Sequence, residues 1–161
     1  MRAEILHQEQ GYIATFEHHF SQGADAVWAM LTDNEKLQQW FSELRVGELA
    51  KGGFMNFDMG DGTVEKMLIT DLLEGHVLAF EWAEDHVRFE VEEENGGACL
   101  RLIETIRRIT PQTPRDLAGW HVCLDVIQAL LEGNEIQRGQ EWEVQYPEYK
   151  RLMESMSVEL E

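Results

Sequence analysis

The chain has 161 residues, of which 43% are hydrophobic, and 31 acidic side chains against 13 basic ones give a formal net charge of −18. The length fits one domain, and the hydrophobic fraction is large enough for a core, which argues against a disordered chain. Nucleic acids and anionic membranes are bound through clustered Lys and Arg, and no basic run is longer than a pair such as Arg107-Arg108. We therefore expect neither a nucleic-acid nor a membrane partner.

Three features of the sequence predict a cytoplasmic protein. Residues 1–9 show no apolar run after their single Arg, so we expect no signal peptide. A membrane-spanning helix needs about 20 apolar residues, and no stretch of the chain meets this. Cys99 and Cys123 are the only cysteines, too few for the disulfide framework of a secreted protein.

The first predicted elements are one strand and two short helices. Residues 12–20 mix aromatic and β-branched side chains with polar ones, which is typical of a strand. Residues 24–31 place apolar side chains at helical spacing. A second helix is predicted to start at residues 32–35, where side-chain oxygens can cap the free amides and Glu35 lies in the first turn. It would place Leu37, Trp40 and Phe41 on one side.

Six short strands are predicted next, and four of the five turns between them contain glycine. Strands joined by such tight turns are antiparallel neighbours. Val87, Phe89 and Val91 alternate with charged residues, so this strand should have one buried face and one solvated face. The predicted strands cover residues 44–49, 54–59, 64–72, 77–82, 87–93 and 98–108.

A long helix is predicted over residues 114–131. Thr113 offers a capping hydroxyl, Pro114 suits the first helical position, and Gly133 is a typical C-terminal cap. Apolar residues recur at intervals of three and four in two adjacent rows, so the helix should be buried on more than one side. Residues 147–158 could form one more amphipathic helix. We expect a domain at 1–133 and an extension at 134–161 that packs on the domain or on a dimer partner.

This order of elements predicts an α+β fold in which a curved antiparallel sheet wraps around the long helix. A cavity is expected between them wherever side chains do not meet, and concave apolar sites of this kind usually bind small molecules.

No motif in the sequence carries recognisable catalytic, cofactor or metal chemistry. Residues 58–62 lack the spacing of a calcium loop and are better explained as a hairpin turn. His18 and His19 are adjacent on a strand, so they point to opposite faces and cannot chelate one ion together; we expect one core and one surface histidine. His121 and Cys123 diverge by roughly 200° on a helix, which excludes a thiol–imidazole dyad. We therefore predict no cofactor and no metal site.

Two sets of polar residues allow more than one interpretation. His121, beside Trp120, could hydrogen-bond a buried ligand or could be a satisfied core histidine. Glu65, Glu81 and Glu104 fall within predicted strands, and we expect them to be outward-facing surface acids.

Several segments together resemble a known family. They are Val27-Trp28-Ala29-Met30-Leu31-Thr32-Asp33 followed by Leu37 and Trp40-Phe41, then Gly52-Gly53-Phe54, Leu78-Ala79-Phe80-Glu81-Trp82, and Gly119-Trp120 followed by Leu124, Ile127 and Leu131. In this order they resemble the activator-of-heat-shock-protein-90-ATPase-like family. That family belongs to the START-like, helix-grip superfamily, together with birch-pollen-allergen-like proteins, polyketide cyclases and lipid-transfer domains. The resemblance implies a helix-grip fold with a hydrophobic cavity beneath the long helix, and it implies no common catalytic set.

Our leading hypothesis is non-catalytic binding of a small hydrophobic molecule, a lipid or an aromatic metabolite, in that cavity. A cyclase- or hydrolase-like enzyme is the first alternative, with His121 and an inward acid such as Glu65 or Glu104 as its polar pair. A co-chaperone, or a homodimer formed through the C-terminal extension, is the second. The residues predicted to line the cavity are Trp40, Phe54, Phe57, Phe80, Trp82, Trp120, His121 and Leu124.

Overall fold

The computed structural model describes residues 3–9 and 11–159, with side chains as far as Met156. They divide into two compact units, residues 3–106 and the segment from residue 107 onward. The domain boundary expected at residue 133 stays a prediction.

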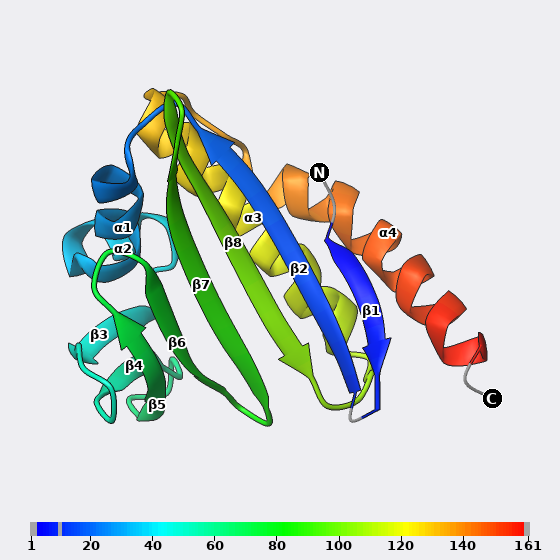
Figure 1. The fold of residues 1–161 in the computed structure, drawn as a ribbon. Helices are drawn as coiled ribbons and strands as arrows, with labels where there is room; N and C mark the ends of the chain where they lie inside the picture. The colour runs from blue at the N-terminus through cyan, green and yellow to red at the C-terminus, as the bar shows by residue number, and fades with distance from the viewer. Residues whose placement is uncertain (1–2, 10, 160–161) are drawn as a thin grey trace. The chain divides into compact units, whose positions relative to one another are not determined.

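Unit 1 is an antiparallel sheet with two short helices (Figure 1). Its strand order is β1-β2-β8-β7-β6-β5-β4-β3, so β3 to β8 form a continuous meander and β2 pairs with the last strand of that meander. The elements are β1 (Glu4–Gln8), β2 (Gly11–Phe20), α1 (Ala24–Thr32), α2 (Asn34–Trp40), β3 (Leu44–Glu48), β4 (Phe54–Asp58), β5 (Val64–Leu73), β6 (Val77–Trp82), β7 (Asp85–Glu94) and β8 (Gly97–Ile106).

The first strand and both helices that were predicted are confirmed, as are the six later strands, with ends that differ by at most about two residues. The strand β1 was not predicted. Its side chains are mostly exposed, and it lies at an edge of the sheet, so its sequence lacks the buried alternation that marks the other strands.

Strand alternation gives the sheet two different faces. The inner face, as we name it, carries the buried rows; one row runs through Phe16, Leu102, Phe89 and Leu78, which are successive cross-strand partners. The outer face carries the residues in between, most of them charged or polar. The predicted alternation of Val87, Phe89 and Val91 with charged neighbours is therefore confirmed, since all three are buried.

The helices α1 and α2 are held together by specific hydrogen bonds. The Asp33 carboxylate accepts from the Glu35 amide at 3.1 Å, which confirms the predicted start of the second helix. The indole Nε1 of Trp40 donates to the Met30 carbonyl at 2.7 Å, and both residues are buried. Within unit 1, α1 packs against β7 and β8, while α2 contacts β3.

Unit 2 consists of two long helices, α3 (Thr113–Glu132) and α4 (Arg138–Glu159), which pack on each other. The predicted end of α3 is confirmed, because Gly133 adopts a left-handed conformation with φ of 74°. Thr113 was predicted to cap this helix, but it is the first helical residue. Its hydroxyl accepts a hydrogen bond from the Thr110 amide, so it secures the preceding turn.

The last helix begins nine residues earlier than predicted, and Pro147, taken as its first residue, lies inside it. A proline inside a helix removes one backbone hydrogen bond and normally kinks it. Aromatic residues of α4 lie on both sides of this position. Before it, Trp142 stacks on Tyr146 with ring centroids 4.8 Å apart, and after it Tyr149 is fully buried. None of the described helices, α3 and α4 included, is long and apolar enough to cross a membrane.

Candidate functional site

Three half-buried aromatic rings meet where the end of α2 faces β4 and β6. Phe41, Phe57 and Trp82 form a triangle with centroid separations of 5.5–6.0 Å, and each pair is arranged edge to face. Edge-to-face pairs of this kind are favourable beyond the apolar area that they bury. Phe57 and Trp82 lie on the inner face, in line with the buried Met55 and Phe80 of their own strands. We name these three residues the aromatic triangle.

Buried rings connect the aromatic triangle to the interior of unit 1. Trp40 contacts Phe41 at 6.0 Å between centroids, and Phe80 contacts Trp82 at 6.4 Å. Trp40 and Phe80 each contact Phe89 at 6.3 Å. The structure thus brings together four of the predicted cavity residues, Trp40, Phe57, Phe80 and Trp82, in one cluster whose outer members are partly accessible.

Phe54 lies elsewhere. It is on the opposite face of β4 from Phe57, and its ring is covered by the Lys66 ammonium at 4.4 Å from the centroid. Gly47 on β3 makes room for this ring, because a Cβ at that position would overlap the ring edge. The structure therefore separates Phe54 from the aromatic triangle.

A carboxyl group is buried on the inner face, two strands from the aromatic cluster. Phe80, Val87, Glu104 and Ala14 are successive cross-strand partners, and Glu104 is only 1% exposed. The expectation that Glu104 is a surface acid is wrong. It has the same strand parity as Leu100 and Leu102, so it must face inward with them. The same expectation is confirmed for Glu81, which is exposed and alternates with the buried Phe80. Glu65 is also exposed, but it is the cross-strand partner of Phe57 and therefore lies on the inner face.

The two adjacent histidines of β2 divide as predicted. His18 is 9% exposed on the inner face, where its ring stacks near Phe20 with centroids 6.1 Å apart. His19 is exposed on the outer face. His18 lies opposite Leu100, four residues along β2 from the partner of Glu104, or about 13 Å at the usual rise of a strand. His18 and Glu104 are therefore too far apart to act as one acid–base pair.

The predicted site residues of α3 are all buried: Trp120, His121 and Leu124 are at most 4% exposed. Within unit 2, Nδ1 of His121 is 2.8 Å from the hydroxyl of Tyr149, and Nε2 is 3.5 Å from the Asp125 carboxylate. His121 is thus a satisfied buried histidine, and its contact with a ligand stays a prediction. The sequence marked Tyr149 as an apolar docking residue, but nothing in the local pattern paired it with His121.

An open hollow of about 490 Å³ lies at the β1–β2 end of the sheet. It contains none of the residues predicted to bind a ligand, and much of its lining is polar. Its walls are formed by Gln8, Glu9, Gly11, Tyr12, Ile13 and Thr105.

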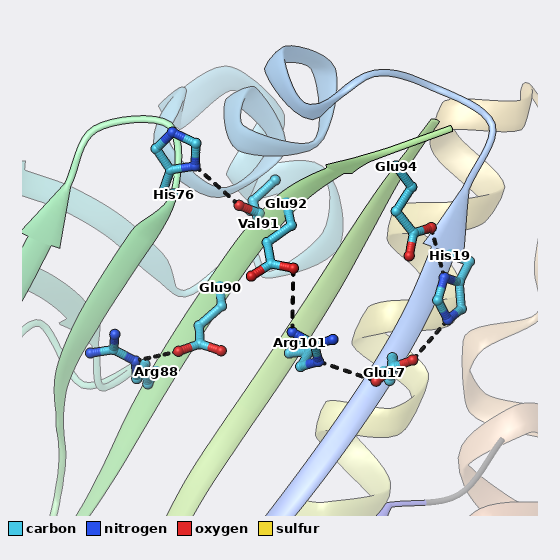
Figure 2. Close-up of polar contacts among 9 residues, drawn as sticks. All are labelled: Glu17, His19, His76, Arg88, Glu90, Val91, Glu92, Glu94 and Arg101. Carbon is cyan, nitrogen blue, oxygen red and sulfur yellow. Dashed lines mark hydrogen bonds and ion pairs between the residues drawn. The ribbon is translucent and has the colours of Figure 1, made fainter. Parts of the chain in front are cut away.

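The outer face carries a network of ion pairs (Figure 2). Arg101 on β8 donates to Glu17 at 3.1 Å and lies 3.7 Å from Glu92. His19, on β2, lies between two carboxylates, with Nδ1 2.8 Å from Glu94 and Nε2 2.8 Å from Glu17.

A second part of this network lies nearer β5. Arg88 donates from Nε to Glu90 at 2.8 Å and from Nη1 to Asp71 at 3.1 Å. Both hydrogen bonds lower the energy of the guanidinium and raise the pKa of Arg88, the one to Glu90 more strongly. The neighbouring His86 is hydrogen-bonded to Thr70, with its Nε2 2.7 Å from the Thr70 hydroxyl oxygen.

The charges around His19 shift its pKa and that of its neighbours. Hydrogen bonds first to Glu94 and then to Glu17 raise the pKa of His19, because they favour the imidazolium. Hydrogen bonds from Arg101 and then from His19 lower the pKa of Glu17. Burial, followed by the charge of Glu17, raises the pKa of the Cys99 thiol.

With this geometry in view, comparisons with known proteins decide the family. Residues 23–132, more than half of the chain, match the family model described as Activator of Hsp90 ATPase homolog 1-like protein. The chain belongs to this family. No protein with a curated functional description matches it.

Solved structures agree with the family and establish the fold. A conserved protein of unknown function from Enterococcus faecalis, EF2215, is 26% identical, with a TM-score of 0.80 over 94% of this chain and 91% of that one. CalU16 from Micromonospora echinospora is 16% identical, with a TM-score of 0.73 over 95% of this chain and 99% of that one. DynU16, from the dynemicin biosynthetic locus, is 20% identical, with a TM-score of 0.64 over 74% and 47%. The predicted α+β helix-grip fold class is thus confirmed.

Proposed function

We propose that this member of the Activator of Hsp90 ATPase homolog 1-like family binds a small, largely apolar molecule on the inner face of its sheet. The observation that carries the proposal is the aromatic triangle, Phe41, Phe57 and Trp82, whose rings meet edge to face while staying half-buried. Partly accessible rings on a buried apolar base suit a flat or aliphatic ligand. The helix-grip fold is used for ligand binding, which supports the same conclusion.

The buried carboxyl of Glu104 sharpens the class of ligand. It lies in the same inner-face row as Phe80, with Val87 between them, so roughly 10 Å separates the two strands that carry them. A mostly apolar ligand of that length with one hydrogen-bond donor could contact both the rings and this carboxyl. Long or fused-ring molecules with a single polar end are therefore our preferred candidates. Trp120, His121 and Leu124 remain further candidate contacts from α3.

An enzyme of the cyclase or hydrolase type is the second candidate, because Glu104 is a buried acid on a mostly apolar face. Such chemistry would need a second polar group within hydrogen-bonding reach of the reacting atoms. The buried histidine of the same face, His18, is too distant from Glu104 for this role. Binding without reaction therefore fits the described inner face better.

Two aromatic residues of the same strand provide a matched test. Phe57 belongs to the aromatic triangle and Phe54 lies on the outer face, and both are partly buried. We expect Phe57→Ala to weaken binding of the neutral fluorescent dye N-phenylnaphthylamine by about two- to twelvefold, since one aromatic contact contributes about 0.5–1.5 kcal/mol. Phe54→Ala should leave the dye affinity unchanged.

The dye experiment should be joined by native mass spectrometry and a thermal-shift screen of apolar metabolites on the full chain. A ligand that binds the folded state raises the melting temperature, and the rise grows with the logarithm of the ligand concentration above Kd. Equal dye affinity in the Phe57 and Phe54 variants would contradict the proposed site. No shift with any apolar metabolite would contradict the function itself.

A further inference from the structure

Three different metal-ligating side chains converge on the outer face: Glu17, His19 and Cys99, which we name the outer-face cluster. His19 and Cys99 are direct cross-strand partners on β2 and β8, and Glu17 is the next residue of β2 on the same face. One donor atom from each residue lies within 4.8 Å of the other two. None of the three belongs to the inner face, where we place the ligand.

The orientation of His19 is that of a metal ligand. Its Nδ1 lies 2.8 Å from a carboxylate oxygen of Glu94, so Glu94 can accept the Nδ1 proton and fix the ring (Figure 2). Histidines that bind metals generally donate their second ring N–H to a carboxylate or a carbonyl in this way. The other nitrogen, Nε2, points at Glu17 at 2.8 Å, toward the rest of the cluster.

Glu17 is oriented in a similar way. Arg101 donates to Oε2 of Glu17 at 3.1 Å, which turns the other oxygen, Oε1, toward His19. A carboxylate ligand that is held by a second hydrogen bond needs little reorganisation when a cation arrives. The half-buried Glu17 and the exposed His19 thus each have a supporting partner, and the buried Cys99, opposite His19 on β8, is the third donor.

We propose that the outer-face cluster binds one zinc-type divalent cation through Nε2 of His19, a carboxylate oxygen of Glu17 and the sulfur of Cys99. A mixed sulfur, nitrogen and oxygen donor set selects zinc over calcium and magnesium, which require oxygen ligands. Tetrahedral coordination at normal bond lengths needs donors about 3.3–3.6 Å apart. The cluster reaches this when the His19–Glu17 pair opens slightly and the sulfur moves closer. Neither the family nor the proposed ligand binding assigns a metal to this face.

Binding of the cation releases protons to solvent. Cys99 binds as a thiolate and loses its thiol proton. If His19 is protonated beforehand, the proton between its Nε2 and Glu17 is released as well. The side chain of His19 is 56% exposed. The fourth coordination position therefore faces solvent and is filled by water.

Cobalt(II) provides a direct test, because it occupies zinc sites and a cobalt–thiolate bond has a strong near-ultraviolet charge-transfer band. The experiment uses the reduced, chelator-treated full chain, titrated with cobalt(II) alone. We expect this band together with the visible bands of a four-coordinate ion, at one cobalt per chain. Zinc should abolish both sets of bands by displacement.

Two pairs of variants locate the site. Cys99→Ser should remove the charge-transfer band, while Cys123→Ser, at the other cysteine of the chain, should keep it. His19→Gln should weaken cobalt binding by at least about tenfold, because even the loss of an outer hydrogen-bond partner costs 10–100-fold in metal affinity. His7→Gln, at an exposed histidine of β1, should bind normally.

Several results would overturn the proposal. They are the absence of a thiolate band in the native chain, a band that survives Cys99→Ser, or equal cobalt affinity in the His19 and His7 variants. Far-ultraviolet circular dichroism of each variant separates lost binding from lost folding. If Cys99→Ser fails to fold, the surface substitution His19→Gln still decides the outcome.

Discussion

The inner and outer faces of the sheet are built from the same strands by opposite physical means. On β7 the inner residues Val87, Phe89 and Val91 are fully buried, whereas Arg88 and Glu90 of the outer face form a solvent-facing ion pair. Apolar burial contributes most of the stability of a domain, while exposed ion pairs contribute about 0–1 kcal/mol each. We therefore expect stability to depend on the inner face and any response to ions or pH to arise on the outer face.

The largest difference between the faces should appear at two positions of β7, one on each face. Phe89 is 1% exposed and contacts Trp40 and Phe80, so Phe89→Ala should lower the free energy of unfolding by about 3–5 kcal/mol. Glu92→Ala should change it by about 0.5 kcal/mol or less, because this side chain is 65% exposed. Urea denaturation of both variants measures the difference. Losses of similar size would contradict the division between the faces.

A smaller effect is expected for the polar contact that joins α1 to α2. Trp40→Phe keeps an aromatic ring but removes the N–H that donates to the Met30 carbonyl, so we expect a loss of about 1–3 kcal/mol. Trp28→Phe, at a half-buried position of α1, is the matched control and should cost less. If the two variants are equally stable, the buried hydrogen bond is not what holds the two helices together.

The smallest effect concerns pH and the outer-face residue His86. Burial, followed by the positive charge of Arg88, lowers the pKa of His86, and the charge of Glu81 opposes this only in part. The unfolded chain therefore takes up this proton at a higher pH than the folded chain does. The contribution of His86 to stability is present above its unfolded pKa of about 6.5 and is lost as the pH falls toward its folded pKa.

The His86→Gln variant isolates this contribution, since glutamine can keep a hydrogen bond to Thr70. We expect the native chain to lose more stability than the variant between about pH 7.5 and about pH 5.5. Other groups of the network titrate in both proteins, so their contributions cancel in the difference. Parallel losses in the two proteins, or an NMR titration midpoint for His86 at or above its ordinary value, would contradict the prediction.

Local pattern was sufficient for much of unit 1. The alternation of residues 87–93 and the glycine turns predicted six of its strands, because each of these signals acts within a few residues. The inward position of Glu104 could also have been predicted. It shares strand parity with Leu100 and Leu102, and only the assumption that acids face water hid it.

Other features could not be predicted from local pattern. The full length of α4 was obscured by Pro147, since a proline more often starts a helix than lies within one. The partnership of His121 with Tyr149 depends on the packing of α4 on α3. The outer-face cluster depends on the register of β2 against β8, which no spacing along the chain reveals.

The strand order has a consequence for folding. From β3 to β8 every strand pairs with its neighbour in sequence, so these hairpins close short loops, whereas the pairing of β2 with β8 joins opposite ends of unit 1. Contacts between distant segments carry a larger loop-closure entropy and tend to form later. We therefore expect the meander to form first and β2 to add last. Glu17 and His19 would then meet Cys99 only in the final step of folding. A cation bound by all three residues would therefore slow the separation of β2 from β8 during unfolding.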